Sequence, residues 1–147
     1  MFLIQPTTTA QWQALVKEIS ERRGICIDIA VENYLVITLD AFTKNVLLLE
    51  TPIAIEFLTA VQTHSGLTNH KLRNVGDRCL IIAGFFNQQS EKHNVNPEYF
   101  AEIGQQSYLT LGERDEKGYN PALFLELGHR FTDLTTILYH MHQGIKP

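Results

Sequence analysis

The chain has 147 residues and a formal net charge of −4, with 44% hydrophobic and 19% charged residues. This length fits one domain that can bury a sizeable core without disulfides or metal. Lysine and arginine are spread along the sequence, which argues against nucleic-acid binding and against a polybasic membrane patch, because both depend on clustered positive charge.

The two cysteines, Cys26 and Cys79, stand among aliphatic residues and have no CxxC spacing. We expect two reduced, buried thiols that act as small hydrophobic side chains. The N-terminus lacks the charged region of a signal peptide, and the apolar stretch over residues 46–61 is interrupted by two acids and a proline. These features predict a cytoplasmic protein without a membrane span.

The first predicted helix begins after the threonines at positions 7–9, whose hydroxyls can cap its N-terminus. It ends at Gly24, a natural residue for a helix C-terminus. Between these limits, one face of the helix carries apolar residues at i, i+3, i+4 and i+7, which are Trp12, Leu15, Val16 and Ile19.

The segment over residues 25–42 fits two patterns. Its first half alternates apolar and other residues as a strand does, and Glu32-Asn33 could form the turn of a hairpin. The same segment also carries a helical stripe that includes Val31, Leu35 and Phe42. We favour one long, largely buried helix and keep the hairpin as the alternative.

The middle of the chain predicts two more helices. Thr51-Pro52 has the residues of a helix start, with proline in the first turn, and that helix should stop near Ser65-Gly66. Residues 68–74 are polar and predict a loop or a short helical turn. Asp77 should then cap a helix over the apolar run at residues 80–86, which should lie at the centre of the fold.

Two further helix starts combine asparagine with proline. Asn96-Pro97 should begin a helix whose apolar stripe extends to Leu111. A charged loop over residues 114–118 follows. Asn120-Pro121 should begin a last helix that continues to about Gly144.

The last predicted helix has the most regular pattern in the chain. Apolar residues recur at spacings of 3, 4, 3, 4 and 3, which are the a and d positions of a heptad repeat. We favour packing inside a helical bundle and keep a dimer seam as the alternative. As a tentative interface, these positions are Phe124, Leu127, Phe131, Leu134, Leu138 and Met141.

Several motifs resemble those of a group of bacterial all-helical proteins of uncharacterised function. The pattern is GD, an apolar run, GFF, a polar connector, an aromatic pair, then G and SY. The resemblance implies a helix rather than a hairpin over residues 27–42, and it implies no activity. It rests on residues 76–86, residues 94–100, Gly104, Ser107-Tyr108 and, loosely, residues 34–36.

The same stretch has a structural interpretation without the resemblance. Gly84 and Gly104 lower helix stability relative to alanine, so we expect them where two central helices cross closely. Asp77 can pair with Arg73 or Arg78 as well as cap a helix. A polar binding pocket is the alternative interpretation of this stretch. A pocket for an apolar ligand is a further possibility, and its lining would be Phe85, Phe86, Tyr99 and Tyr108.

The sharpest chemical candidate is a Glu-x-x-His motif at Glu126 and His129, with Asp133 four residues further on. On a helix these side chains share a face, as metal ligands do in carboxylate bundles. A di-iron site needs two such motifs, and the sequence has one. We therefore favour a solvated polar face, with a metal site as the alternative.

The sequence contains no nucleophile elbow and no glycine-rich phosphate loop. It predicts an all-α, single-domain helical bundle of five or six helices, with no cofactor. The favoured function is a non-enzymatic interaction or regulatory module that binds a protein partner or a second copy of itself as a homodimer. The alternatives are a metal-dependent enzyme and an apolar small-ligand-binding protein.

Overall fold

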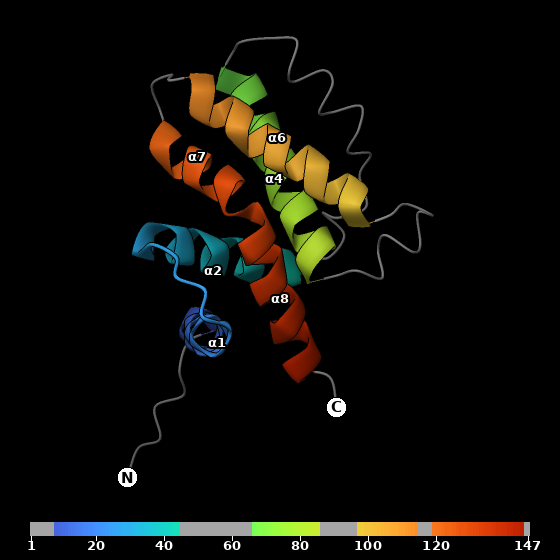
Figure 1. Ribbon diagram of the computed structural model, residues 1–147. Coiled ribbons are helices and arrows are strands. Elements are labelled where there is room, and N and C mark those ends of the chain that lie inside the picture. The colour runs from blue at the N-terminus through green and yellow to red at the C-terminus, as the bar shows by residue number, and fades with distance from the viewer. Residues whose placement is uncertain (1–7, 45–65, 86–96, 115–118, 146–147) are drawn as a thin grey trace.

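A computed structural model of the chain describes residues 8–44, 66–85, 97–114 and 119–145 (Figure 1). These residues form an all-α bundle of six helices, which confirms the predicted fold class. The helices are α1 (Thr8–Arg23), α2 (Ile29–Lys44), α4 (Gly66–Gly84), α6 (Pro97–Arg114), α7 (Pro121–His129) and α8 (Phe131–Ile145).

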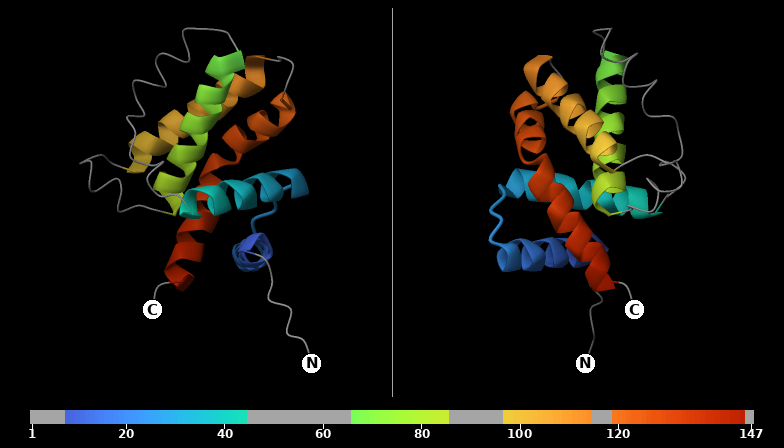
Figure 2. Two further views of the ribbon diagram at one scale, coloured as in Figure 1. Left: turned by 180° about the vertical axis from the view of Figure 1, so that it is seen from behind. Right: turned by 45° about the vertical axis from the view of Figure 1, so that its right-hand side comes forward.

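The helices form two groups that α8 connects. Helix α6 packs between α4 and α7, and these three make one group (Figure 1). Helices α1 and α2 pack against each other below them, and α1 is seen end-on where α2 lies across the view, so their axes cross at a large angle (Figure 1 and Figure 2). Helix α8 continues from α7, packs against α4 and reaches α1. Helix α2 therefore lies between the first group and α1.

Helix α1 agrees with its prediction. It ends at Arg23, and Gly24 follows with φ of +66°, a conformation that glycine adopts without strain. Val16 and Ile19 are buried on its inner face.

The aromatic ring of Trp12 fixes the other end of α1 to the bundle. Its ring centroid lies 6.0 Å from that of Phe85, in an edge-to-face arrangement. The ring of Phe85 also lies 4.8 Å from that of His142 on α8. Apolar and aromatic contacts thus join α1 to the end of α4 and to α8.

Residues 29–44 form a helix, so the helical interpretation is confirmed and the hairpin is wrong. Residues 25–28 are not helical and connect α1 to α2. Cys26 lies in this connection and is exposed, which corrects the expectation of two buried thiols. Cys79 is buried as expected, and burial raises the pKa of its thiol to about 12.

Helix α4 corrects the prediction for the middle of the chain. It begins at Gly66, so residues 68–74 are helical, and Asp77 lies well inside the helix instead of capping it. Leu72 and Val75 are fully buried and continue the stripe that includes Cys79. The buried face of α4 therefore begins ahead of the apolar run at residues 80–86. The helix predicted from Thr51-Pro52 lies outside the described residues.

The single last helix of the prediction is two helices, α7 and α8. Pro121 begins α7 as expected, with Asn120 in an extended conformation at the N-cap. Arg130 lies between the helices, with φ of −96° and ψ of 11°. Its backbone N–H still donates to the carbonyl of Glu126, and its carbonyl accepts from Leu134. The chain therefore bends at Arg130 while the apolar spacing continues.

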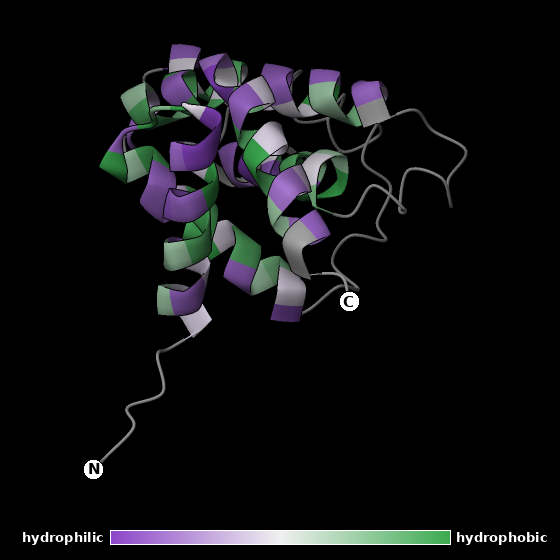
Figure 3. Cartoon of the chain, turned by 60° about the horizontal axis from the view of Figure 1, so that its bottom comes forward, coloured by the Kyte–Doolittle hydropathy of each residue, from purple (hydrophilic) through white to green (hydrophobic). Residues whose placement is uncertain are grey.

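The core lies where all the helices meet. Every described helix carries hydrophobic and hydrophilic residues together (Figure 3), and the hydrophobic ones supply the interior. In α4, Leu80, Ile81 and Ile82 are all fully buried, which confirms the central place of this apolar run. No helix in the described part of the chain is both long and apolar enough to cross a membrane.

Candidate functional site

A cluster of four polar side chains joins α2, α4 and α6. Oδ1 of Asp77 accepts hydrogen bonds from the hydroxyls of Tyr34, at 2.7 Å, and Tyr108, at 2.6 Å. The hydroxyl of Tyr34 in turn accepts a hydrogen bond from Nε of Arg73, at 3.0 Å. We call these four residues the polar cluster. Each tyrosine comes from a different helix, so the cluster fixes both helices to α4.

Local spacing explains half of this arrangement. Arg73 and Asp77 lie four residues apart on α4 and share one face of the helix. The guanidinium of Arg73 also lies 5.3 Å from the centre of the Tyr34 ring. The rings of Tyr34 and Tyr108 both pack against Phe124 of α7, at 5.6 and 5.9 Å. The polar cluster therefore has an aromatic wall on one side.

Gly76 makes room for the tyrosine from α6. A Cβ atom at this position would lie 2.6 Å from Cε1 of Tyr108, which is closer than such atoms approach. Tyr108 is fully buried, and its ring cannot swing away without disturbing Phe124 and Phe131. The glycine before Asp77 thus permits the hydrogen bond that Asp77 accepts from Tyr108.

Burial decides the electrostatics of the cluster. It raises the pKa of Asp77 to about 6, although hydrogen bonds from Tyr108 and Tyr34 and the charge of Arg73 act in the opposite direction. Burial, together with the Asp77 carboxylate, raises the pKa values of both tyrosines. Both hydroxyls therefore stay protonated donors at neutral pH, while Asp77 changes charge close to it.

The sequence identified part of this cluster. It indicated Asp77 with Arg73, but as a helix cap with a neighbouring partner. It missed Tyr34, which belongs to the apolar stripe of α2 and gave no sign of a polar partner. Tyr108 was predicted as part of the lining of an alternative apolar pocket, whereas its hydroxyl donates a hydrogen bond to Asp77.

The outer face of α2 is the second notable feature. Ile29 and Ile37 are 66% and 61% exposed, and Asn33 lies exposed midway between them. The spacing of four residues puts all three on one side of the helix. We call Ile29, Asn33 and Ile37 the outer α2 strip. In the described part of the chain, the other large hydrophobic side chains that are exposed are two tyrosines, Tyr99 and Tyr139.

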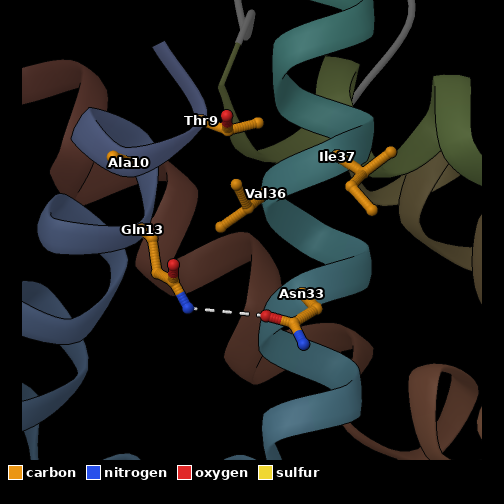
Figure 4. Close-up of a pocket in the computed structure, with 6 residues that line it drawn as sticks. All are labelled: Thr9, Ala10, Gln13, Asn33, Val36 and Ile37. Carbon is orange, nitrogen blue, oxygen red and sulfur yellow. Dashed lines mark hydrogen bonds between the residues drawn. The ribbon is translucent and has the colours of Figure 1, made fainter. Parts of the chain in front are cut away.

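An open hollow adjoins this strip. It has a volume of about 340 Å³ and lies between α1 and α2 (Figure 4). Nε2 of Gln13 bridges its lower edge with a hydrogen bond of 3.2 Å to Glu32 and a longer one of 3.5 Å to Asn33. Its lining residues are Thr9, Ala10 and Gln13 from α1 and Asn33, Val36 and Ile37 from α2.

The residues of the predicted metal site occupy two helices. Glu126 and His129 belong to α7 and Asp133 belongs to α8, on the other side of the bend at Arg130. The carboxylate of Asp133 pairs with Arg130 at 3.0 Å. Among the residues that the structure describes, no three His, Cys, Asp or Glu side chains gather as a metal ion requires. The metal site stays a prediction that no geometry described here favours.

The residues of the predicted apolar pocket are placed differently from one another. Phe85 packs on Trp12 and His142, whereas Tyr108 belongs to the polar cluster. Tyr99 is 40% exposed and packs on its neighbour Phe100. Phe86 lies outside the described residues. Phe85 thus contacts Trp12 and His142, whereas Tyr108 contacts Asp77.

The six heptad positions line the interior of the chain. Each of them is at most 3% exposed, which is the burial of core residues and not of a free surface. They therefore account for the packing of α7 and α8 within the bundle, and they leave no exposed seam on these helices. The residues are Phe124, Leu127, Phe131, Leu134, Leu138 and Met141.

The two glycines expected at a helix crossing have different neighbours. A Cβ at Gly104 would lie 2.7 Å from Cβ of Cys79, so α6 does approach α4 closely there. A Cβ at Gly84 would instead meet Leu138 of α8, at 2.7 Å. The expected crossing is thus present at Gly104, while Gly84 serves the contact between α4 and α8.

Comparison with known proteins gives no match for this chain: no protein family, no curated protein and no solved structure is similar to it.

Proposed function

We propose that the chain is a helical interaction module that acts by binding and not by catalysis, and that the outer α2 strip is its binding surface. The observation that carries this proposal is the exposure of Ile29 and Ile37 on one face of one helix. The partner that fits this surface is another helix, because the strip presents two isoleucines on either side of Asn33 at four-residue spacing, beside a hollow with both polar and apolar lining residues.

The energetics favour a covered strip. Burying an isoleucine side chain contributes roughly 1.5–3 kcal/mol, so two isoleucines represent a considerable loss when they stay in water. Single exposed hydrophobic residues are ordinary, whereas apolar side chains that gather on one face mark interaction sites, and Ile29 and Ile37 share one face of α2 next to a hollow. A partner helix that covers Ile29 and Ile37 would recover this free energy.

The polar cluster holds this surface in place. Tyr34 lies next to Asn33 in sequence but on the inner face of α2, where it bonds to Asp77. On the other side, Gln13 joins α1 to α2 through Glu32, which is buried. Helix α2 is thus fixed from two directions, and the strip is presented by a rigid element, which lowers the entropic cost of binding.

A photo-crosslinking amino acid in place of Ile37 tests the proposal in living cells. We expect a crosslinked product of defined mass that disappears when Ile29→Asp is added, because the charge would disrupt the same contact. The matched control carries the crosslinker in place of Tyr139, which is 42% exposed on α8 and should give no such product. Equal crosslinking at both positions, or none at Ile37, would refute the proposal.

A further inference from the structure

We infer that the partner of the outer α2 strip is a second copy of this chain, bound through an antiparallel contact between the two α2 helices that is centred on Asn33. The inference rests on the proposed function and names its partner. It comes from the symmetry of the strip, from the place of the hollow and from the distribution of charge on α2.

The strip is symmetric about Asn33. Ile29 precedes it by four residues and Ile37 follows it by four. A two-fold axis through Asn33 would place Ile29 of each copy opposite Ile37 of the other. A two-fold interface needs a patch that complements itself, and this arrangement provides one.

The chemistry at the centre is also self-complementary. An asparagine side chain has both a hydrogen-bond donor and an acceptor, so two asparagines that face each other can bond in both directions. Within one chain, Oδ1 of Asn33 accepts a long hydrogen bond of 3.5 Å from Nε2 of Gln13, so a facing asparagine can offer a closer partner, and a single asparagine between paired helices favours one register. Asn33 would therefore set the alignment while the isoleucines supply apolar burial.

The hollow lies where this pairing needs space. Asn33, Val36 and Ile37 form its α2 side, and Ala10 forms part of its α1 side. In the antiparallel pair, Ile29 of the second copy would arrive beside Ile37, at the edge of this hollow. A volume of about 340 Å³ is sufficient for an isoleucine side chain. Each copy would thus insert its Ile29 side chain into the hollow of the other copy.

The charge of α2 favours a copy of the chain over an ionic partner. The outward side of a surface helix is normally charged. Here it carries one charge, on Lys44, which pairs with Asp40 at 2.9 Å. The six exposed positions of the helix are Ile29, Ala30, Asn33, Ile37, Ala41 and Lys44. Ala30 and Ala41 are small and allow a second helix to approach closely.

Engineered cysteines test the predicted alignment in the full chain. All variants carry Cys26→Ser, because Cys26 is exposed and would form disulfides of its own. We expect Asn33→Cys alone to form a disulfide-linked dimer under mild oxidation, because residue 33 meets itself at the axis. Ile29→Cys or Ile37→Cys alone should give little dimer, whereas an equimolar mixture of the two should give the heterodimer.

A second measurement does not depend on cysteine chemistry. Sedimentation equilibrium should show a reversible dimer with a dissociation constant on the order of micromolar, as expected for a contact of limited area. Asn33→Asp should raise this constant at least tenfold, because it places two negative charges together at the axis. Circular dichroism should show unchanged helicity for this exposed substitution.

The outcomes separate this inference from the function on which it rests. A photo-crosslink from Ile37 with twice the mass of the chain, together with the cysteine pattern above, supports both. A crosslink to a different protein or within one chain, with no disulfide at residue 33, overturns the homodimer. The antiparallel alignment would be overturned if Ile29→Cys alone formed as much disulfide-linked dimer as Asn33→Cys alone.

Discussion

The carboxyl group of Asp77 lies in an environment where burial disfavours its charged form. The pKa of Asp77 in the folded chain is about 6, which is above the usual value of 3.8 for an aspartate. The folded chain therefore holds this proton more tightly than the unfolded chain does. This difference contributes on the order of 3 kcal/mol to the free energy of unfolding. The contribution is complete below pH 4 and is lost as the pH rises through 6.

Asp77→Asn should remove this pH dependence. The amide oxygen can still accept hydrogen bonds from Tyr34 and Tyr108, but it carries no charge to bury. We expect the variant to be at least as stable as the natural chain at pH 7.5 and to lose its advantage at pH 4.5. Urea denaturation at several pH values measures the difference.

A matched control separates this effect from the general response to acid. Glu102→Gln changes an exposed side chain on α6 and should follow the pH profile of the natural chain. Parallel profiles for the natural chain and Asp77→Asn would contradict the assignment. The groups that face Asp77 are Tyr34 from α2, Arg73 from α4 and Tyr108 from α6.

At the scale of the elements, α4, α6 and α8 meet at Gly104. A Cβ atom there would lie 2.5 Å from Cζ of Phe131 and 2.7 Å from Cβ of Cys79. One of these atoms ends a rigid ring and the other adjoins the backbone of α4, so neither can move aside easily. The close contact of three helices depends on the missing side chain.

Gly104→Ala should therefore destabilise the chain by about 1–3 kcal/mol, as overpacking of a core does. Glycine-to-alanine changes inside helices are usually stabilising by about 1 kcal/mol, so the expected sign is the reverse of the normal one. Chemical denaturation measures the change. Gln106→Ala, at an exposed position of the same helix, is the control and should have little effect.

A second substitution tests the cause. Phe131→Leu removes the ring that the new methyl group would strike, at the price of a smaller core residue. In a double-mutant cycle, the loss caused by Gly104→Ala should be smaller in the Phe131→Leu background. If the two changes in unfolding free energy simply add, the contact with Phe131 is not the reason that Gly104→Ala is destabilising.

At the scale of the whole molecule, the heptad positions hold the two groups of helices together. Helix α8 packs on α4 and reaches α1, and Leu134 and Leu138 are fully buried along it. Leu138 also fills the space beside Gly84. These leucines are core residues that link the α4–α6–α7 group with the α1–α2 pair.

Leu134→Ala and Leu138→Ala should each lower the free energy of unfolding by about 2–5 kcal/mol, because each leaves a cavity in the core. Together they approach the whole stability of an ordinary domain. Tyr139→Ala, on the exposed side of the same helix, should have a much smaller effect. Variants that lose self-association but keep full stability would restore the seam interpretation.

The sequence predicted what local chemistry determines. Proline in the first turn marked the starts of α6 and α7, and Gly24 marked the end of α1. The prediction was wrong where polar residues surround the apolar positions of a helix, as they do at Leu72 and Val75 in α4. The bend at Arg130 also escaped prediction, because the apolar spacing runs through it without interruption.

The candidate sites could not be predicted in the same way. Asp77 is 43 residues from Tyr34 and 31 from Tyr108, and only helix packing brings these side chains together. Ile29 and Ile37 have the composition of core residues. Their exposure became evident once α1, α4 and α7 occupied the other sides of α2.

The edge-on contact between Trp12 and Phe85 has an optical consequence. Trp12 is the one tryptophan of the chain, and it lies where α1 meets the end of α4 and His142 of α8. Its fluorescence therefore reports on this junction alone. Tyr34 and Tyr108, which lie beside Asp77, are on the opposite side of α2 and belong to a different contact. Red-shifted tryptophan emission would signal that α1 has detached, even while the rest of the bundle keeps its helical circular dichroism.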